Sequence, residues 1–155
     1  MLRKLRRLSK LSICEWFVLI QLALSALVAS IALRFFSISR LTDCISQFAR
    51  NRVFACFPIF HDRIGCSRLA NLADIAAWLT HQQGRCLMRS LLLFWLFNAR
   101  NESAELVIGV RKDDSIFNSH AWIELKGKVV GENENAPLGF TTMLRFSAFG
   151  SQQSQ

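Results

Sequence analysis

Apolar residues dominate the first two thirds of the chain, in long runs that short polar breaks separate. Between Trp16 and Leu33 no residue is charged. As a helix, this run would be about 27 Å long, close to the hydrocarbon thickness of a bilayer. Its polar residues, Gln21, Ser25 and Ser30, do not gather on one face. We therefore expect a buried core helix, a membrane-associated helix or a cleaved export signal.

Charges beside this run argue against full insertion into a bilayer. Glu15 stands directly before it, and Arg34 follows it directly. A single span with the basic N-terminus inside would also place the rest of the chain outside the cell, where free cysteines are unfavourable.

Three further helices are predicted after this run. Residues 41–57 read as one helix, which ends before a proline. Ser67 is placed to cap the next, in which apolar residues recur at helical spacing until Gly84 ends it. The last begins near Cys86 and runs to about Phe97.

The hydrophobic period changes after residue 103. The segment ELVIGV (105–110) is typical of a short buried strand, RKDDSIFNS (111–119) of a charged loop, and HAWIELKGKVVGE (120–132) of a hairpin. At least three antiparallel strands therefore follow the helices, which predicts the α+β class.

The register of the predicted hairpin decides which residue faces His120. A three-residue loop over 125–127, with Gly127 in the left-handed position, puts Glu132 directly opposite His120. A two-residue loop pairs His120 with Asn133 instead. Directly opposed β-carbons lie about 5 Å apart, so either residue could orient the imidazole.

Composition and charge narrow the class of protein. The chain has 155 residues, 52% of them apolar, which is enough for one domain with a sizeable core. The formal net charge is +8, and five of the first ten residues are basic. We expect no nucleic-acid partner, because no recognition-helix or base-stacking motif accompanies the charge. Acidic peptides or anionic lipid surfaces suit it equally well.

The five cysteines show neither a CxxC pair nor a disulfide-framework spacing, which favours a reducing compartment. Four residues could be drawn as a zinc site, namely Cys56, His61, Cys66 and His81. Their spacing matches no structural zinc pattern, so we predict no metal.

Cys86 and His120 are the candidates for chemistry. A helix N-terminus lowers the pKa of a thiol and makes it a nucleophile, although most free cysteines simply pack. His120 begins a strand, where an imidazole is less easily explained by packing than in a loop. Together with Glu132 or Asn133, these residues suggest a Cys-His-acid (or amide) site.

The segments CLMRSLLLFWLF, ELVIGVRK and SHAWIELKGKVV closely resemble the core of the lasso-peptide leader peptidases. These form the transglutaminase-like B-protein family of lasso-peptide maturation. The resemblance covers roughly residues 84–146, including the closing TTMLRF, and the motifs occur in the family's order and separation.

The resemblance implies a papain/transglutaminase-like cysteine protease with Cys86 as nucleophile, His120 as base and Glu132 as third member. The family usually has aspartate at the third position, so this chain differs by one methylene. Arg85 and Arg89 either favour the thiolate form of Cys86 or are solvated residues without a direct role.

The resemblance also implies a division of the chain and a set of partners. The expected parts are a helical apolar region (1–83), a transglutaminase-like cysteine protease core (84–150) and a flexible tail (151–155). The expected partners are a precursor peptide, a leader-recognition protein and an ATP-dependent macrolactam synthetase, with possible membrane contact through the first helix. We expect a cytoplasmic protein without a cofactor of its own, since the partner synthetase uses the ATP and no P-loop is present.

Two other hypotheses for the function stay open. One is a non-catalytic, membrane-associated scaffold or binding subunit that retains the fold. The other keeps the thioester chemistry but transfers the acyl group to an amine instead of water.

Overall fold

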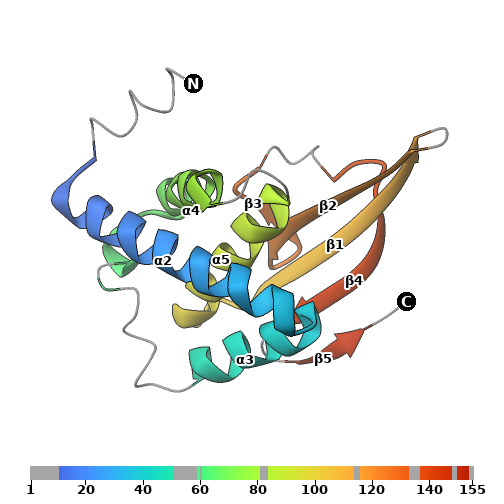
Figure 1. Cartoon of the computed structure of the whole chain (residues 1–155), viewed down its shortest axis with the longest axis horizontal. Coiled ribbons are helices and arrows are strands. Elements are labelled where there is room, and N and C mark those ends of the chain that lie inside the picture. Colours follow the sequence, from blue (N-terminus) through green and yellow to red (C-terminus); the bar gives the residue numbers. More distant parts are fainter. Residues whose placement is uncertain are drawn as a thin grey trace.

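The computed structural model describes residues 11–50, 59, 61–80, 84–113, 116–132, 137–147 and 150–153. Within these residues a group of helices precedes an antiparallel sheet, so the expected α+β class is confirmed (Figure 1). The helices are α2 (Ile13–Phe35), α3 (Ile38–Arg50), the short 3₁₀ helix η1 (His61–Arg63), α4 (Cys66–Thr80) and α5 (Arg85–Ala99). The strands are β1 (Ala104–Asp113), β2 (Ile116–Leu125), β3 (Lys128–Val130), β4 (Thr141–Ser147) and β5 (Gly150–Gln153).

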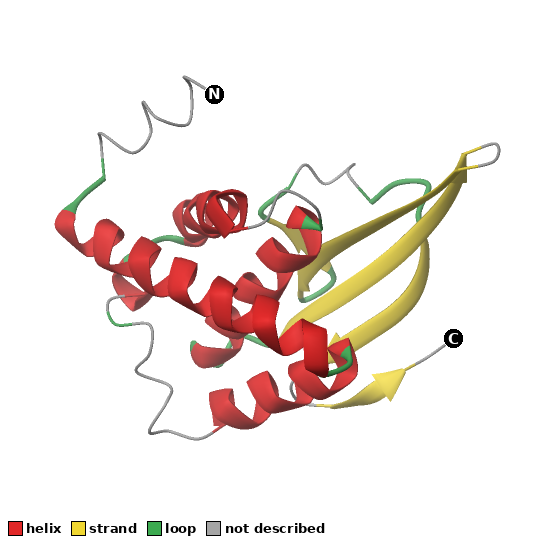
Figure 2. Ribbon diagram, viewed as in Figure 1, coloured by secondary structure: helices red, strands yellow, loops and turns green. Residues whose placement is uncertain are grey.

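The sheet has the strand order β3-β2-β1-β4-β5, and each neighbouring pair is antiparallel. Helix α5 packs against β1 and β2, and α2 and α4 pack on α5 from the side away from the sheet. Figure 2 shows this arrangement as a helical layer beside the sheet. Because α5 lies between the other helices and the sheet, it is apolar almost all round, and Phe94 and Phe97 are fully buried.

Helix α2 buries one face and exposes the other. Val18, Leu22 and Ala26 are fully buried in the core that α4 and α5 share. The helix begins earlier than Trp16 because Ser12 and Glu15 form a capping box around its first turn. By length and composition alone, α2 is apolar enough to cross a membrane.

Several predicted boundaries were wrong. The capping prediction for Ser67 fails because α4 already begins at Cys66, which places Ser67 in the first helical turn. Helix α4 ends at Thr80, and Gly84, with φ of 71°, is the N-cap residue of α5. The later part of the predicted helix 41–57 lies outside the described residues, and α3 covers its beginning.

The charged loop predicted at 111–119 is wrong as well. β1 and β2 continue as a ladder that pairs Arg111 with Asn118 and Lys112 with Phe117. This part of the two-stranded ribbon extends beyond the packed helices, so solvent reaches it. Its strands therefore do not need the alternation of apolar and polar residues by which a half-buried strand is predicted. Residues 151–153, expected in a tail, belong to β5, where Gln153 pairs with Arg145 of β4.

The β2–β3 hairpin closes with a two-residue turn, so the three-residue loop was wrong. Leu125 pairs with Lys128, and Lys126 and Gly127 both have positive φ, 50° and 76°. Two central residues with positive φ make a type I′ turn, whose twist matches that of the flanking strands. The ladder stops at Val130.

Candidate functional site

Cys86 lies in the first turn of α5, as predicted, and its thiol is free and half-buried. No side chain caps this helix start, since Gly84 supplies only backbone there. The first backbone N–H groups of a helix have no partner within it, so they are available to an oxyanion near the thiol.

Ser90 attaches this end of α5 to the strand that carries His120. The buried Ser90 hydroxyl donates a hydrogen bond of 2.9 Å to the carbonyl oxygen of Ala121, the residue next to His120. Residues four apart on a helix are neighbours on its surface, so Cys86 lies one turn from this contact. The packing of α5 therefore places its first turn near the middle of β2, where His120 lies. The prediction that His120 begins a strand was wrong, because β2 already starts at Ile116.

His120 and Glu132 are brought together as a pair. The Nε2 atom of His120 lies 2.7 Å from Oε2 of Glu132, whose side chain is only 8% exposed. The observed register would have opposed His120 to Asn133, which lies outside the described residues. Glu132 reaches the imidazole because Gly131, with φ of 82°, leaves the ladder after Val130.

Arg89 is the third partner in this cluster, and its link to Glu132 was not foreseen. Its guanidinium forms an ion pair with Oε1 of Glu132, while Oε2 of the same carboxylate meets His120. Arg89 is 13% exposed, and it stands three residues after Cys86, on the same side of α5. Arg85 instead pairs with Asp74 at 2.6 Å. Arg85 keeps 40% of its side chain exposed, whereas Arg89 is not a solvated residue. The available signal for Arg89 was its i+3 spacing from Cys86.

Burial and charge in the cluster both favour the neutral form of the imidazole. Burial lowers the pKa of His120, and the positive charge of Arg89 lowers it further. Glu132 alone would favour the imidazolium, but Arg89 on the same carboxylate offsets that attraction. Arg89 also attracts a negative charge on Cys86. The cluster therefore favours an imidazole that can accept a proton.

Aromatic rings pack around the imidazole on the sheet. The ring of Trp122 stacks at 6.1 Å between centroids, and that of Phe140 lies tilted at 5.5 Å. Gly109, opposite His120 in the ladder, makes room for both, because a Cβ there would lie 2.9 Å from the Trp122 ring. An interior glycine in an apolar strand signalled such a close approach, but not which rings make it.

The four residues considered as a zinc set, and the prediction of no metal, stay untested. Of its four members, only Cys66 belongs to the side chains that the structure describes, and its sulfur contacts Nη1 of Arg100 at 3.8 Å. Among the described residues, no group of three or more His, Cys, Asp or Glu could hold a metal ion.

Comparison with known proteins places these observations in a family. The family model described as "Transglutaminase-like superfamily" matches residues 18–145. The chain is also similar to the microcin J25-processing protein McjB of Escherichia coli, with 44% identity over 91 residues, or 59% of this chain. The match spans 41% of the length of that protein. No solved structure matches the chain.

Proposed function

Because the chain belongs to the transglutaminase-like superfamily, we propose that it is a cysteine peptidase that removes the leader from a lasso-peptide precursor. Cys86 is the nucleophile, His120 the base and Glu132 the orienting acid. The observation that carries the proposal is the partly buried pair of His120 and Glu132, which Arg89 links to the cysteine-bearing helix. The motif resemblance and the similarity to a microcin J25-processing protein support the proposed substrate class.

The reaction follows from the roles of the side chains. Glu132 holds Nε2 of His120, which leaves Nδ1 for the thiol of Cys86. The sulfur attacks the carbonyl carbon at the leader–core junction, and backbone N–H groups at the start of α5 stabilise the oxyanion. His120 passes the thiol proton to the leaving amine as the C–N bond breaks. Water, deprotonated by His120, then hydrolyses the thioester and restores the thiol.

The partners belong to the same proposal. A leader-recognition protein delivers the precursor, and an ATP-dependent macrolactam synthetase uses the released core in the cytoplasm. No step assigned to Cys86, His120 and Glu132 consumes ATP or needs a cofactor.

The test is cleavage of a lasso-peptide precursor by the full chain together with the leader-recognition protein, followed by mass spectrometry. We expect free leader and core with the wild type and no product with Cys86→Ala or His120→Ala. Cys44→Ala, which alters an exposed cysteine on α3, is the matched control and should cleave normally. Glu132→Gln should retain more activity than either of the other two variants, because an amide can still accept the imidazole N–H. Processing by Cys86→Ala would refute the mechanism.

Running the reaction in H₂¹⁸O separates hydrolysis from acyl transfer. Hydrolysis puts one ¹⁸O atom into the new carboxylate of the leader, whereas transfer joins the leader to an added amine. Binding of the precursor without any bond cleavage in the wild type would favour the scaffold reading instead.

A further inference from the structure

The outward face of α2 is an uninterrupted apolar stripe. Nine large apolar side chains on this helix are each at least 43% exposed: Ile13, Trp16, Phe17, Ile20, Leu24, Leu27, Val28, Ile31 and Phe35. They recur every three or four residues, so they fall within roughly 120° of the helix circumference and extend for about 33 Å. Exposed apolar patches of this extent mark a surface that another apolar phase covers.

The opposite face of α2 is built into the domain. Glu15 forms an ion pair with Arg68 of α4. The Gln21 side chain accepts a 2.9 Å hydrogen bond from the backbone N–H of Ile59. If α2 left the domain to cross a bilayer, these polar groups would enter hydrocarbon and the core around Leu22 would open. The helix therefore suits a position on a membrane surface and not across it.

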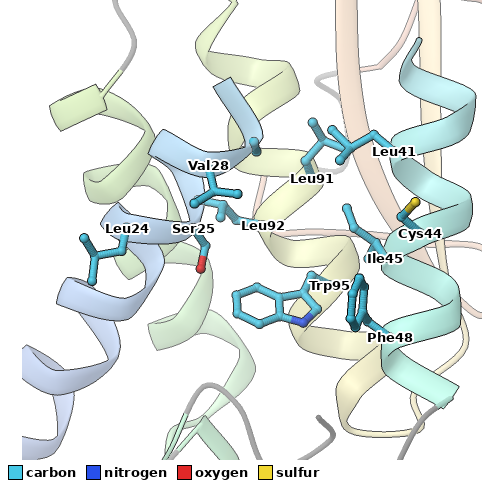
Figure 3. Close-up of a pocket in the computed structure, with 11 residues that line it drawn as sticks. Leu24, Ser25, Val28, Leu41, Cys44, Ile45, Phe48, Leu91, Leu92 and Trp95 are labelled. Atoms are coloured by element: carbon cyan, nitrogen blue, oxygen red, sulfur yellow. The ribbon is translucent and has the colours of Figure 1, made fainter. Parts of the chain in front are cut away.

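An apolar groove continues the stripe between α2, α3 and α5. It has a volume of about 400 Å³. Figure 3 shows its lining side chains coming from all three helices: Leu24, Ser25, Val28, Ala29, Leu41, Cys44, Ile45, Phe48, Leu91, Leu92 and Trp95. The hydroxyl of Ser25 already donates to the carbonyl oxygen of Gln21. This lining suits hydrocarbon, such as the acyl chain of a lipid.

The basic residues around the stripe favour lipids with an anionic headgroup. Five of the first ten residues are basic. At the other end, Arg34 in the last turn of α2 and Arg40 in α3 are exposed. From residue 11 to 42 the single acidic residue is Glu15, which Arg68 neutralises. Basic residues thus flank an uncharged apolar surface, which is the complement of an anionic bilayer.

We propose that the outward face of α2 and the adjoining groove dock the protein on an anionic lipid bilayer, with α2 lying in the membrane plane. A partner helix seated in the groove would leave much of the stripe exposed, including Phe17 and Ile31, whereas a bilayer covers both. Helix α5 lies between α2 and the sheet, so docking leaves His120 and Glu132 uncovered. This surface is independent of the peptidase function.

The test is flotation of the full chain with vesicles of phosphatidylcholine and phosphatidylglycerol, because aggregates do not float. The wild type should float with these vesicles, and the bound fraction should fall at high salt. With vesicles of pure phosphatidylcholine, the bound fraction should be at least tenfold lower. Ile20→Gln/Ile31→Gln should lose binding at least tenfold. Phe117→Gln/Leu138→Gln removes equally exposed apolar side chains away from the stripe and should bind like the wild type. All four side chains are more than half exposed, so both double variants should keep the fold.

Arg34→Gln/Arg40→Gln provides a second test that leaves the apolar stripe intact. This variant should bind anionic vesicles more weakly and with a smaller salt dependence. A wild type that stays unbound, or a stripe variant that floats like the wild type, would overturn the proposal and favour a protein partner for the groove. Equal loss in the stripe and control variants would overturn it as well.

Discussion

Replacing Arg89 with methionine tests whether its charge keeps His120 neutral. Arg89 and His120 bond to different oxygens of the same Glu132 carboxylate, which puts their charges roughly 5–6 Å apart by carboxylate geometry. At an effective dielectric constant of about 20, Coulomb's law gives about 3 kcal/mol of repulsion against the imidazolium. His120 is 22% exposed, so solvent screens part of this, and we take about half. The pKa of His120 should therefore rise in Arg89→Met, with its proton affinity about tenfold higher.

The direction of the His120 pKa shift also predicts how the stability of the fold depends on pH. In the wild type the pKa of His120 lies below its ordinary value of 6.5. The unfolded state therefore binds more protons, and stability falls as pH drops through 6.5 towards the folded value. In Arg89→Met the loss of stability on acidification that His120 causes should become smaller or change sign. The variant also leaves the Glu132 carboxylate buried with one partner fewer, which should cost about 3 kcal/mol of folding free energy near pH 7.

The assay is the NMR titration of the His120 imidazole in a Cys86→Ala background, which removes the second titratable side chain of the candidate site. His120→Gln identifies the signal among the three histidines. Arg85→Met is the matched control, because it removes an arginine from the same helix that pairs with Asp74 and not with Glu132. A His120 pKa that stays unchanged or falls in Arg89→Met would refute the electrostatic argument. In active enzyme, the acid limb of kcat/KM should move to higher pH with the imidazole.

Three further predictions concern the surroundings of the site. Iodoacetamide should modify Cys86 faster than Cys14 or Cys44 near pH 6, and His120→Ala should remove the difference; mass spectrometry of the alkylated peptides checks this. Gly109→Ala should cost about 1–3 kcal/mol in urea unfolding, because its Cβ would lie 2.9 Å from the Trp122 ring; an unchanged midpoint would contradict the packing. Ser90→Ala should cost about 1–3 kcal/mol, since it leaves the Ala121 carbonyl oxygen without its hydroxyl partner; wild-type stability would show that this hydrogen bond contributes nothing.

Local patterns were sufficient to predict four helices followed by the strands β1, β2 and β3, but they did not predict β4 or β5. The apolar run after Cys86 predicted α5 closely, since a helix buried on all sides needs apolar residues throughout. Errors occurred where the local signal was weak. At 111–119 a solvated ribbon resembles a loop, and at Lys126 a non-glycine residue adopts positive φ in the turn.

By itself, the sequence determined which residues are candidates for chemistry: a cysteine at a helix start, and a histidine and a glutamate near a hairpin. Only the tertiary structure decided how they meet. Glu132 reaches His120 because the chain leaves the ladder at Gly131, and Arg89 joins them because α5 packs across β2. Such contacts join segments that are far apart in the chain, and hydrophobic periodicity reports the buried face of an element but not its partner.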